Sequence, residues 1–397
     1  MTTPTRTWHF ITGEYPPDGG GVADYTALVA AGLAKHGCAV HVWSKGESPE
    51  PIVEPFGVVV HRVAGRFGWA GLARLNRELN TCPEPRILCV QYVPHAFGWK
   101  AMNVAFVAWV VGRRVLAGDE IVVMFHEVIF PWVRRPLHHN VIAFVTRIMA
   151  GVLARTAHRQ FVSIPAWAPL VRTFGCLRRA EITTLPIPST IPYAPQPHLA
   201  VATRDQLLTT GTRFVVGHFG TYGSLISQML GPIVRDLLQR RVDVAVVLLG
   251  SNGGRWKHDL LRDQPAWSNH IVATGELTAA QVAIHLQACD LVMQPYPDGA
   301  SVRRTSLMAV LANGVPVVTT TGALSDAVWY SGVVPAVAVE KIADFVDVVC
   351  GLLDDPQART RVGQAGAKLY QDQFTLERTI SILMHDVLER RQPERAS

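Results

Sequence analysis

The sequence has no uninterrupted apolar run long enough to cross a membrane. Its longest apolar stretch, "AMNVAFVAWVVG" at 101–112, is broken by Asn103 and is shorter than the roughly 20 residues that a spanning helix needs. A buried helix of an α/β layer is the favoured interpretation, and a helix resting on a membrane surface is the alternative. The N-terminal segment "MTTPTRTWHFITGEYPP" has too short an apolar core for a signal peptide, so we expect a cytoplasmic protein, with the inner face of the membrane as a second location.

Cysteine pairs and basic tracts are also missing. The six cysteines show neither a CxxC pair nor the cysteine/histidine spacing of a zinc site, which argues against a disulfide scaffold and favours reduced, buried thiols. The 37 basic and 31 acidic residues leave a net charge of +6, an excess that suits phosphate-bearing ligands or an anionic membrane surface. No basic tract is interleaved with aromatic residues, so we expect no nucleic-acid partner, and the scattered arginine pairs such as Arg113-Arg114 are interpreted mainly as solvated helix faces.

Apolar segments of strand length alternate with helical segments along both halves of the 397-residue chain. They are "TWHFIT", "AVHVWS", "GVVVHRV", "RILCVQYV" and "EIVVMFH" in the first half, and "RFVVGHFG", "VDVAVVLLG", "DLVMQPY" and "VPVVTT" in the second. Continuous β-branched runs between helices are typical of parallel sheets covered on both faces. The predicted fold class is therefore α/β, with two Rossmann-like, doubly wound domains.

A proline-rich segment marks the predicted domain boundary. "LPIPSTIPYAPQPHLA" at 185–200 holds five prolines and cannot form a helix or a central strand. We therefore predict an N-terminal domain over 1–190 and a C-terminal domain over 191–375. Residues 376–397 are predicted to form a final amphipathic helix and tail, with the helix packing back toward the N-terminal domain.

Ligands of open parallel sheets bind beyond the carboxyl ends of the strands, so the turns that follow the strands hold the candidate residues. In the first half, Gly19, Gly20 and Gly21 would let the backbone approach an anion at a helix start, although a plain flexible turn is the alternative. His126 and Glu127 end another strand. They could donate to a hydroxyl or orient an acceptor, unless the histidine is structural.

In the second half, three strand ends finish in small or polar residues that resemble the walls of a flat nucleotide pocket, and each could also be an ordinary turn. They are Gly220 with Thr221, Gly250 with Ser251, and Gly275 with Glu276.

The segment "YPDGASVRRTSLMAVLANGVPVVTT" at 296–320 places two arginines at the start of an apolar helix. Arg303 and Arg304 are predicted in its first turn, where the helix dipole disfavours positive charge. A diphosphate gripped by guanidinium groups and by backbone amides would compensate for them. The amides belong to the preceding residues Gly299, Ala300 and Ser301. We expect one arginine of the pair, Arg304, to point inward; two solvated arginines are the alternative.

Four segments together resemble a family 4 glycosyltransferase of the GT-B fold, and the resemblance covers nearly the whole chain. They are "PPDGGGVADYT", the "FHE" strand end, the proline-rich linker and "DGASVRRTSLMAVLANGVPVVTT". The last is similar to the family's Glu-x7-Glu region, with Asp298 at the first glutamate and Ser306 at the second. The resemblance implies that Asp298 binds hydroxyls of the donor sugar and that Ser306 binds the ribose, with an uncharged hydrogen bond in place of a carboxylate.

The resemblance implies a retaining hexosyltransferase of polysaccharide or glycoconjugate biosynthesis that uses a nucleotide diphosphate sugar as donor. In the family, the turn that corresponds to "GHFGTYGS" carries an arginine and a lysine for the diphosphate, and this chain has neither there. Arg303 and Arg304 are hypothesised to replace that charge. Because no DxD motif is present, we expect no metal and no cofactor beyond the UDP-sugar or GDP-sugar substrate.

The acceptor is left open among a carbohydrate, a lipid-linked chain and a small molecule, with peripheral membrane contact as an added expectation. Two other functions remain as alternatives. A GT-B nucleotide-sugar epimerase would need acid-base carboxylates near the sugar, and this chain offers few beside Asp298, Glu127 and Glu276. A non-catalytic nucleotide-sugar-binding protein would be consistent with the serine at the second glutamate position.

Overall fold

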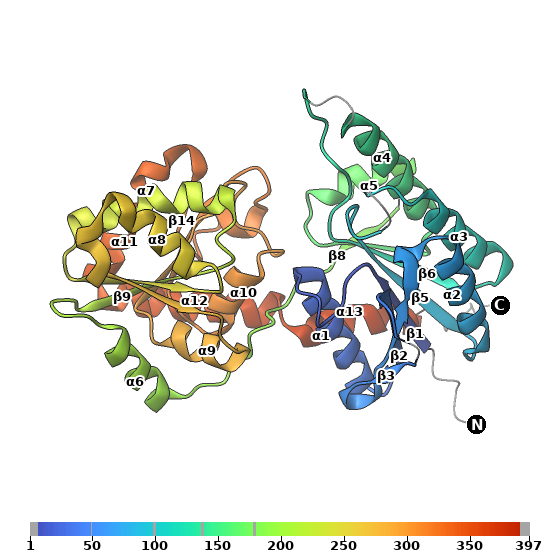
Figure 1. The fold of residues 1–397 in the computed structure, drawn as a ribbon, viewed down its shortest axis with the longest axis horizontal. Coiled ribbons are helices and arrows are strands. Elements are labelled where there is room, and N and C mark those ends of the chain that lie inside the picture. The colour runs from blue at the N-terminus through green and yellow to red at the C-terminus, as the bar shows by residue number, and fades with distance from the viewer. Residues whose placement is uncertain (1–6, 49, 98–100, 136–138, 178–179, 390–397) are drawn as a thin grey trace, which may run out of the picture. The chain divides into compact units, whose positions relative to one another are not determined.

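The computed structural model describes residues 7–48, 50–97, 101–135, 139–177 and 180–389. The chain divides into two compact units, Met1–Pro186 with Leu376–Ser397 and Ile187–Thr375 (Figure 1). The division falls inside the proline-rich segment, a few residues before the predicted boundary. The helix α13 (Leu376–Glu389) packs against the first helix of the N-terminal unit, where the Cδ1 atom of Ile380 lies close to Gly32.

The N-terminal unit is built on an eight-stranded sheet with the order β3-β4-β2-β1-β5-β6-β7-β8. Its strands are β1 (Thr7–Thr12), β2 (Ala39–Lys45), β3 (Ile52–Val53), β4 (Val59–Val63), β5 (Arg86–Tyr92), β6 (Glu120–Phe125), β7 (Arg159–Val162) and β8 (Ile182–Thr184). All pairs are parallel except β3 with β4. The helices are α1 (Gly21–Lys35), α2 (Trp69–Thr81), α3 (Val104–Leu116), α4 (His139–Thr156) and α5 (Trp167–Gly175), with 3-10 turns at Pro55–Gly57 and Ala64–Phe67.

The C-terminal unit is built on a six-stranded, wholly parallel sheet with the order β11-β10-β9-β12-β13-β14. Its strands are β9 (Phe214–Phe219), β10 (Val244–Leu249), β11 (Ile271–Gly275), β12 (Leu291–Gln294), β13 (Val317–Thr321) and β14 (Ala336–Ala338). The helices are α6 (Pro197–Leu207), α7 (Ser224–Arg240), α8 (Gly253–Asp263), α9 (Ala279–Gln287), α10 (Thr305–Ala312), α11 (Phe345–Asp354) and α12 (Pro356–Gln373), with 3-10 turns at Pro265–Asn269, Ala327–Tyr330 and Val339–Asp344.

Burial on both faces explains why the central strands are continuous apolar runs. Every residue of β1, β5 and β10 is buried, because helices cover both sides of each sheet. The α/β class with two doubly wound sheets is confirmed. The sequence did not predict β7, whose residues Arg159 and Gln160 are buried in spite of their polarity. Arg159 pairs with Glu120 at 3.3 Å, a contact between neighbouring strands that no local pattern reveals.

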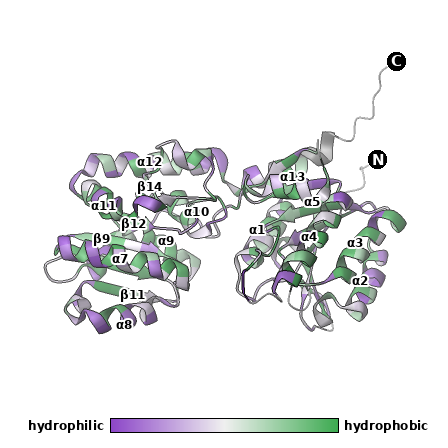
Figure 2. Cartoon of the chain, turned by 90° about the horizontal axis from the view of Figure 1, so that it is seen from above, coloured by the Kyte–Doolittle hydropathy of each residue, from purple (hydrophilic) through white to green (hydrophobic). Residues whose placement is uncertain are grey.

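The apolar segment at 101–112 becomes α3, and Asn103 is its N-cap, accepting a hydrogen bond from the Phe106 amide at 2.9 Å. Phe106 and Val110 pack into the core, as the favoured interpretation requires, and much of the helix is coloured hydrophobic in Figure 2. Its other face is exposed at Val104, Val115 and Leu116. Among the residues that the structure describes, no helix combines the length and the apolar character needed to cross a bilayer.

Candidate active site

Three turns meet at the carboxyl edge of β9, β10 and β11. The Gly220 amide donates to the Leu249 carbonyl at 3.1 Å, and Gly250 forms an isolated bridge with Gly275. Gly250 has φ 127°, and a Cβ atom there would lie 2.2 Å from the Gly220 carbonyl oxygen. Only glycine fits this position. The structure therefore brings the three predicted glycine turns together.

Around these glycines, the predicted polar side chains Thr221, Ser251 and Glu276 are exposed. Beneath them lies Tyr222, a buried residue that the sequence analysis did not single out. Its hydroxyl lies 3.1 Å from the His218 carbonyl oxygen and 3.3 Å from that of Leu249. Tyr222 thus supports the glycine turns from below, and the polar groups remain at the surface of the edge.

The turn after β12 carries the charged group of the site. The Asp298 carboxylate binds Arg303 at 2.8 Å and also contacts Arg304. All three side chains are 22–30% exposed, so the two arginines are partly solvated and are paired with a carboxylate. The helix α10 begins at Thr305, with Arg304 as its N-cap. The arginines therefore precede the first turn, contrary to the prediction.

Asp298 compensates for part of the positive charge of the two arginines. The sequence analysis had assigned all of that compensation to a bound diphosphate. Two guanidinium groups and one carboxylate leave a net charge of +1 within this cluster. Both guanidinium groups reach Asp298, whereas only one had been expected to point inward. The cluster thus stays cationic, which suits an anionic ligand.

The loop that precedes α10 is held to the end of β13 and to Gly322, which follows it. Gly299 has φ 85°, and a Cβ atom there would lie 2.3 Å from the Gly322 nitrogen. The Gly299 amide donates to the Tyr296 carbonyl at 3.0 Å, and the Ala300 amide donates to the Thr320 carbonyl at 2.7 Å. These two amides are therefore engaged within the chain, which corrects the predicted role of Gly299 and Ala300 in an amide cradle.

Ser301 is fully buried, and its Oγ atom has no hydrogen-bond partner among the described residues. A buried hydroxyl without a partner costs stability and is a common feature of sites that receive a ligand atom. Ser301 lies between Asp298 and the arginines along the chain. The predicted cradle used backbone amides, whereas the polar atom without a partner among the described residues is the side-chain hydroxyl of Ser301.

Ser306, at the position of the second glutamate of the Glu-x7-Glu region, belongs to a polar chain. Its Oγ lies 2.9 Å from the Tyr296 hydroxyl, which donates to Gln294 Oε1 at 3.2 Å. Arg304 stacks over the Tyr296 ring at 4.7 Å. Burial raises the pKa of Tyr296 to about 12, so its phenol stays neutral at pH 7. The sequence analysis missed Tyr296 and Gln294, since an aromatic residue and a glutamine at a strand end carry no motif.

In the N-terminal unit, the glycine turn leads directly into α1, which begins at Gly21 with Gly20 as its N-cap. Gly19 and Gly21 are exposed, as is Asp24 in the first turn. The Asp24 carboxylate already complements the positive end of the helix dipole. It would therefore oppose a phosphate there, which weakens the predicted anion role of Gly20 and Gly21.

Arg62, another residue that the sequence analysis missed, supports this turn from β4. It donates to the Pro16 carbonyl and, at 2.8 Å, to the hydroxyl of Ser44. Its guanidinium carbon lies 5.9 Å from the centre of the Tyr15 ring. No local pattern predicts these contacts, because β4 and the glycine turn are far apart in the sequence.

His126 lies at the end of β6 and is only 7% exposed. Its Nε2 atom lies 2.8 Å from Gln91 Oε1, an acceptor, so Nε2 carries the proton. The ring packs edge-on against Tyr25 with centroids 4.9 Å apart, and burial lowers the pKa of His126 to about 3. Tyr25 is itself buried. Glu127 is half-buried beside them.

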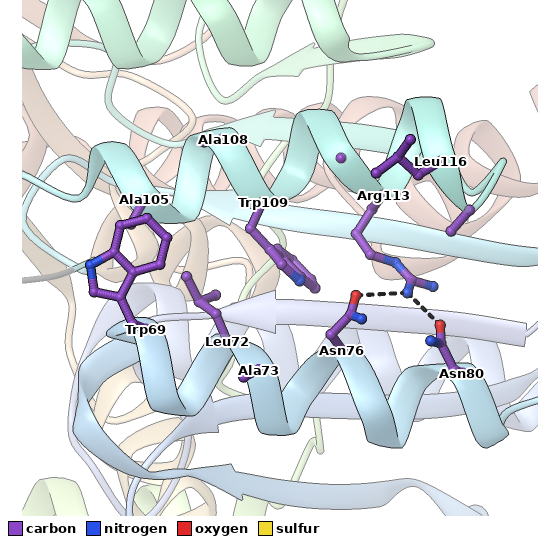
Figure 3. Close-up of a pocket in the computed structure, with 12 residues that line it drawn as sticks. Trp69, Leu72, Ala73, Asn76, Asn80, Ala105, Ala108, Trp109, Arg113 and Leu116 are labelled. Carbon is purple, nitrogen blue, oxygen red and sulfur yellow. Dashed lines mark hydrogen bonds between the residues drawn. The ribbon is translucent and has the colours of Figure 1, made fainter.

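A groove of about 570 Å³ lies between α2 and α3 (Figure 3). Its walls include Trp69, Leu72, Trp109 and Leu116. Arg113 lies on its floor, bound to Asn76 at 3.0 Å, to Asn80 at 2.6 Å and to the buried carboxylate of Asp119. Arg113 is 2% exposed, so its interpretation as part of a solvated helix face is wrong.

Comparison with known proteins supports the assignment of the fold. Residues 215–355 match the family model described as "Glycosyl transferases group 1", whereas no curated protein matches the chain. Among solved structures, sucrose-phosphate synthase from Thermosynechococcus elongatus is similar, with a TM-score of 0.74, 13% identity, and coverage of 97% of this chain and 98% of that one. Anabaena Alr3699/HepE, solved with UDP and glucose, has a TM-score of 0.71, 14% identity, and coverage of 96% and 99%.

WaaG, a glycosyltransferase of lipopolysaccharide biosynthesis, has a TM-score of 0.62, 16% identity, and coverage of 94% and 99%. The chain therefore has the fold of GT-B glycosyltransferases. Within it, residues 215–355 of the C-terminal unit match the model of group 1 glycosyltransferases.

Proposed function

We propose that this protein is a retaining glycosyltransferase that moves a sugar from a nucleotide diphosphate sugar to an acceptor hydroxyl without a divalent metal. The observation that carries the proposal is the cationic cluster of Asp298, Arg303 and Arg304 beside the buried hydroxyl of Ser301, inside the segment that matches the glycosyltransferase model. In glycosyl transfer, negative charge grows on the departing diphosphate, and fixed cations lower the barrier by stabilising it.

In this proposal, Asp298 binds the two arginines before the donor arrives and binds hydroxyls of the donor sugar afterwards. Before the donor binds, it holds both guanidinium groups in place. A diphosphate carries more negative charge than one carboxylate and can take over the guanidinium contacts. Asp298 is then available to the hydroxyls of the donor sugar, as the resemblance implies. Ser306 and the Tyr296 hydroxyl bind the ribose through neutral hydrogen bonds.

The donor base is proposed to be uridine, with guanosine as the alternative. The support is that the similar structure of Alr3699/HepE was solved with UDP and glucose. The turns of Gly220, Gly250 and Gly275 supply a flat surface for the nucleotide, since close approach of the backbone is possible there. Thr221, Ser251 and Glu276 add exposed hydrogen-bonding groups.

For the acceptor, we propose a lipid-linked substrate held at an anionic membrane surface. Val141, Phe144 and Ile148 are exposed at the spacing of one face of α4, and such a stripe is typical of interfacial helices. The preceding segment exposes Trp132 next to Arg134 and Arg135. Aromatic and basic groups together favour anionic lipid headgroups.

Vesicle co-sedimentation tests the membrane proposal. We expect binding to vesicles that contain anionic lipid and none to neutral vesicles, and Phe144→Glu should abolish it. Leu225→Glu, at an exposed position of α7 in the other unit, serves as the matched control. Equal binding of the wild type and of Phe144→Glu would contradict membrane contact through α4 without affecting the proposal of sugar transfer.

Incubation with UDP-sugars and GDP-sugars separates the three candidate functions. A transferase consumes the donor rapidly only when an acceptor is added, an epimerase converts the donor alone, and a binding protein leaves it unchanged. Lipid-linked, oligosaccharide and small-molecule acceptors are tried in parallel, and a chelator is included in one series. Loss of turnover with the chelator and recovery with manganese would contradict the metal-independent mechanism. The anomeric configuration of the product reports retention.

A further inference from the structure

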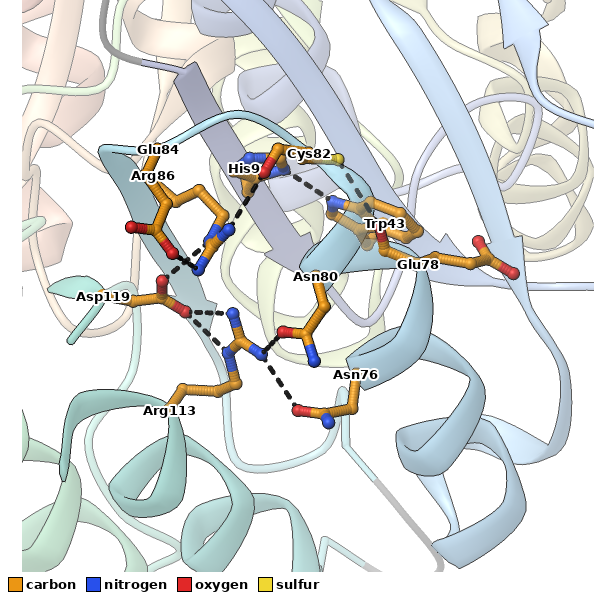
Figure 4. Close-up of polar contacts among 10 residues, drawn as sticks. All are labelled: His9, Trp43, Asn76, Glu78, Asn80, Cys82, Glu84, Arg86, Arg113 and Asp119. Atoms are coloured by element: carbon orange, nitrogen blue, oxygen red, sulfur yellow. Dashed lines mark hydrogen bonds and ion pairs between the residues drawn. The ribbon is translucent and has the colours of Figure 1, made fainter. Parts of the chain in front are cut away.

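A second cluster of potential ligand atoms lies in the N-terminal unit, away from the carboxyl edge of its sheet. His9 of β1 and His41 of β2 are aligned partners in the parallel register, and their rings stack with centroids 5.0 Å apart. Cys82 follows the last residue of α2. One ring nitrogen of each histidine and the Cys82 Sγ atom lie within 4.8 Å of one another. Figure 4 shows His9 and Cys82 in this region.

His9 has a coordinating atom that the described structure leaves unused. The residue is fully buried, and its Nε2 atom has no hydrogen-bond partner among the described residues. The indole N–H of Trp43 donates to the other nitrogen, Nδ1, at 3.2 Å, so Nε2 carries the proton of the neutral ring. Buried ring nitrogens nearly always have a partner, so the unused Nε2 is independent evidence for a ligand.

His41 is oriented for coordination by a second histidine. Its Nδ1 atom lies 3.0 Å from Nε2 of His61, and Nδ1 of His61 lies 3.8 Å from a carboxylate oxygen of Glu78. With its proton on Nδ1, the His41 ring donates to His61 Nε2, and the Glu78 carboxylate lies beyond hydrogen-bond distance on the far side of His61. This protonation leaves the lone pair of His41 Nε2 unused. Metal-binding histidines are typically oriented by such outer partners.

The charges around the cluster permit a cation. Arg86 and Arg113 lie nearby, and each binds a different oxygen of the Asp119 carboxylate, at 2.8 Å and 2.5 Å (Figure 4). Arg86 also pairs with Glu84 at 2.7 Å. The two guanidinium charges are therefore matched by two carboxylates. Deprotonation of Cys82 would add the negative charge that a soft divalent ion requires.

We propose that His9, His41 and Cys82 form a binding site for a soft divalent metal ion, with Zn²⁺ as the preferred ion. Two imidazoles and a thiolate are ligands that zinc prefers, and a water molecule can complete the tetrahedron. Zinc bonds of about 2.0–2.3 Å would draw the three ligand atoms together by roughly 1 Å. Coordination through Nε2 moves the His9 proton to Nδ1 and gives up the contact with the Trp43 indole. The three ligands come from three separate elements, which is why no sequence spacing reveals the site.

The site is separate from the proposed donor site, which lies in the other unit, and it does not depend on the proposed function. His9 is the third residue of β1, so the metal would join β1, β2 and the end of α2 rather than contact a ligand at the carboxyl edge. Its expected role is to stabilise the N-terminal unit, since an ion that binds only the folded state shifts the unfolding equilibrium.

Cobalt substitution tests the site in the full-length protein without an affinity tag. After chelation and buffer exchange, Co²⁺ should bind in a 1:1 ratio, with a thiolate-to-cobalt charge-transfer band and the visible bands of a tetrahedral ion. Zn²⁺ should displace it and raise the melting temperature. Cys82→Ser should remove the charge-transfer band, and His41→Ala should weaken Co²⁺ binding at least tenfold. Cys176→Ser, which changes an exposed cysteine, should leave both readouts unchanged.

Circular dichroism of the metal-free variants shows whether each one folds, so loss of the band can be separated from loss of structure. Binding that stays the same in Cys82→Ser, or the absence of a 1:1 complex in the folded wild type, would overturn the proposal. A charge-transfer band that disappears in Cys176→Ser instead would also overturn it, because the thiolate would then lie elsewhere.

Discussion

The carboxyl edges of the two sheets offer their polar residues to a ligand in different ways. At the edge of the six-stranded sheet, Asp298, Arg303 and Arg304 are between 22% and 30% exposed, and the Ser301 hydroxyl has no hydrogen-bond partner among the described residues. At the edge of the eight-stranded sheet, His126 is 7% exposed and its Nε2 is engaged by Gln91. The edge in the unit that matches the glycosyltransferase model therefore presents a partly exposed charged cluster, whereas the buried imidazole at the N-terminal edge is neutral.

The difference suggests separate duties for the two units under the proposed function. An anionic donor needs cations and hydrogen-bond donors that are partly desolvated and fixed in place. The six-stranded edge has them. A neutral acceptor hydroxyl needs little charge, and the N-terminal unit offers a neutral imidazole, exposed apolar residues and the groove between α2 and α3. The following changes test whether this division holds.

Removing both arginines should have the largest effect. Arg303→Ala with Arg304→Ala deletes two charge-assisted interactions worth about 1.5–3 kcal/mol each. UDP should bind about 100-fold more weakly or worse, as measured by calorimetry. Arg240→Ala, at an exposed position at the end of α7, is the matched control. Donor affinity within threefold of the wild type in the double variant would show that the cluster does not bind the diphosphate.

A side chain at Gly250 should disrupt the three glycine turns. Gly250→Val places a β-branched side chain at φ 127° and 2.2 Å from the Gly220 carbonyl oxygen, so the turn must move. We expect a loss of about 2–4 kcal/mol in the free energy of unfolding, measured in urea, together with loss of nucleotide binding. Gly254→Val, in α8 with no atom near the added Cβ, controls for the loss of a glycine. A stable variant with normal UDP binding would remove these turns from the site.

Asp298→Asn should separate the two duties proposed for Asp298. The asparagine releases both guanidinium groups and removes a negative charge near the phosphates. UDP should therefore bind about tenfold more tightly, a gain of about 1.4 kcal/mol, while sugar transfer should fall. Calorimetry with UDP and turnover with the UDP-sugar give the two readouts. Weaker UDP binding would mean that Asp298 only positions the arginines, with no competition between its carboxylate and the diphosphate.

The sequence predicted more of the fold than of the site. Alternating strands and helices gave the two doubly wound sheets, because buried parallel strands must be continuously apolar. The glycine turns and the charged segment 298–304 were also found from local patterns. The contact between Asp298 and the two arginines was not predicted. It depends on how the loop after β12 folds against β13 and the residues that follow β13. Tyr222 and Tyr296 were missed because a buried aromatic residue at a strand end carries no motif. The His9 cluster was missed because its members are distant in the sequence.

The smallest expected effect is on the pH dependence of the free energy of unfolding, and it is tested at one buried histidine from each unit. Burial lowers the pKa of His126 and of His218 to about 3 from an ordinary value of 6.5. In the unfolded chain both take up a proton as the pH falls through 6.5, whereas in the folded protein they stay neutral. Their stabilising contribution is therefore complete above pH 6.5 and declines as the pH falls toward 3. Between pH 8 and pH 6, each should lower the free energy of unfolding by about 1 kcal/mol.

Urea denaturation of His126→Gln and His218→Gln at both pH values measures these contributions, and His258→Gln, at an exposed position, is the control. Each buried-site variant should lose about 1 kcal/mol of the pH dependence, and the control should lose none. If His126→Gln kept the full dependence while His218→Gln lost its share, His126 would be accessible to protons in the folded state. His126 would then be more open to solvent than its exposed fraction of 7% implies, and it would again be a candidate hydrogen-bond donor to a sugar hydroxyl.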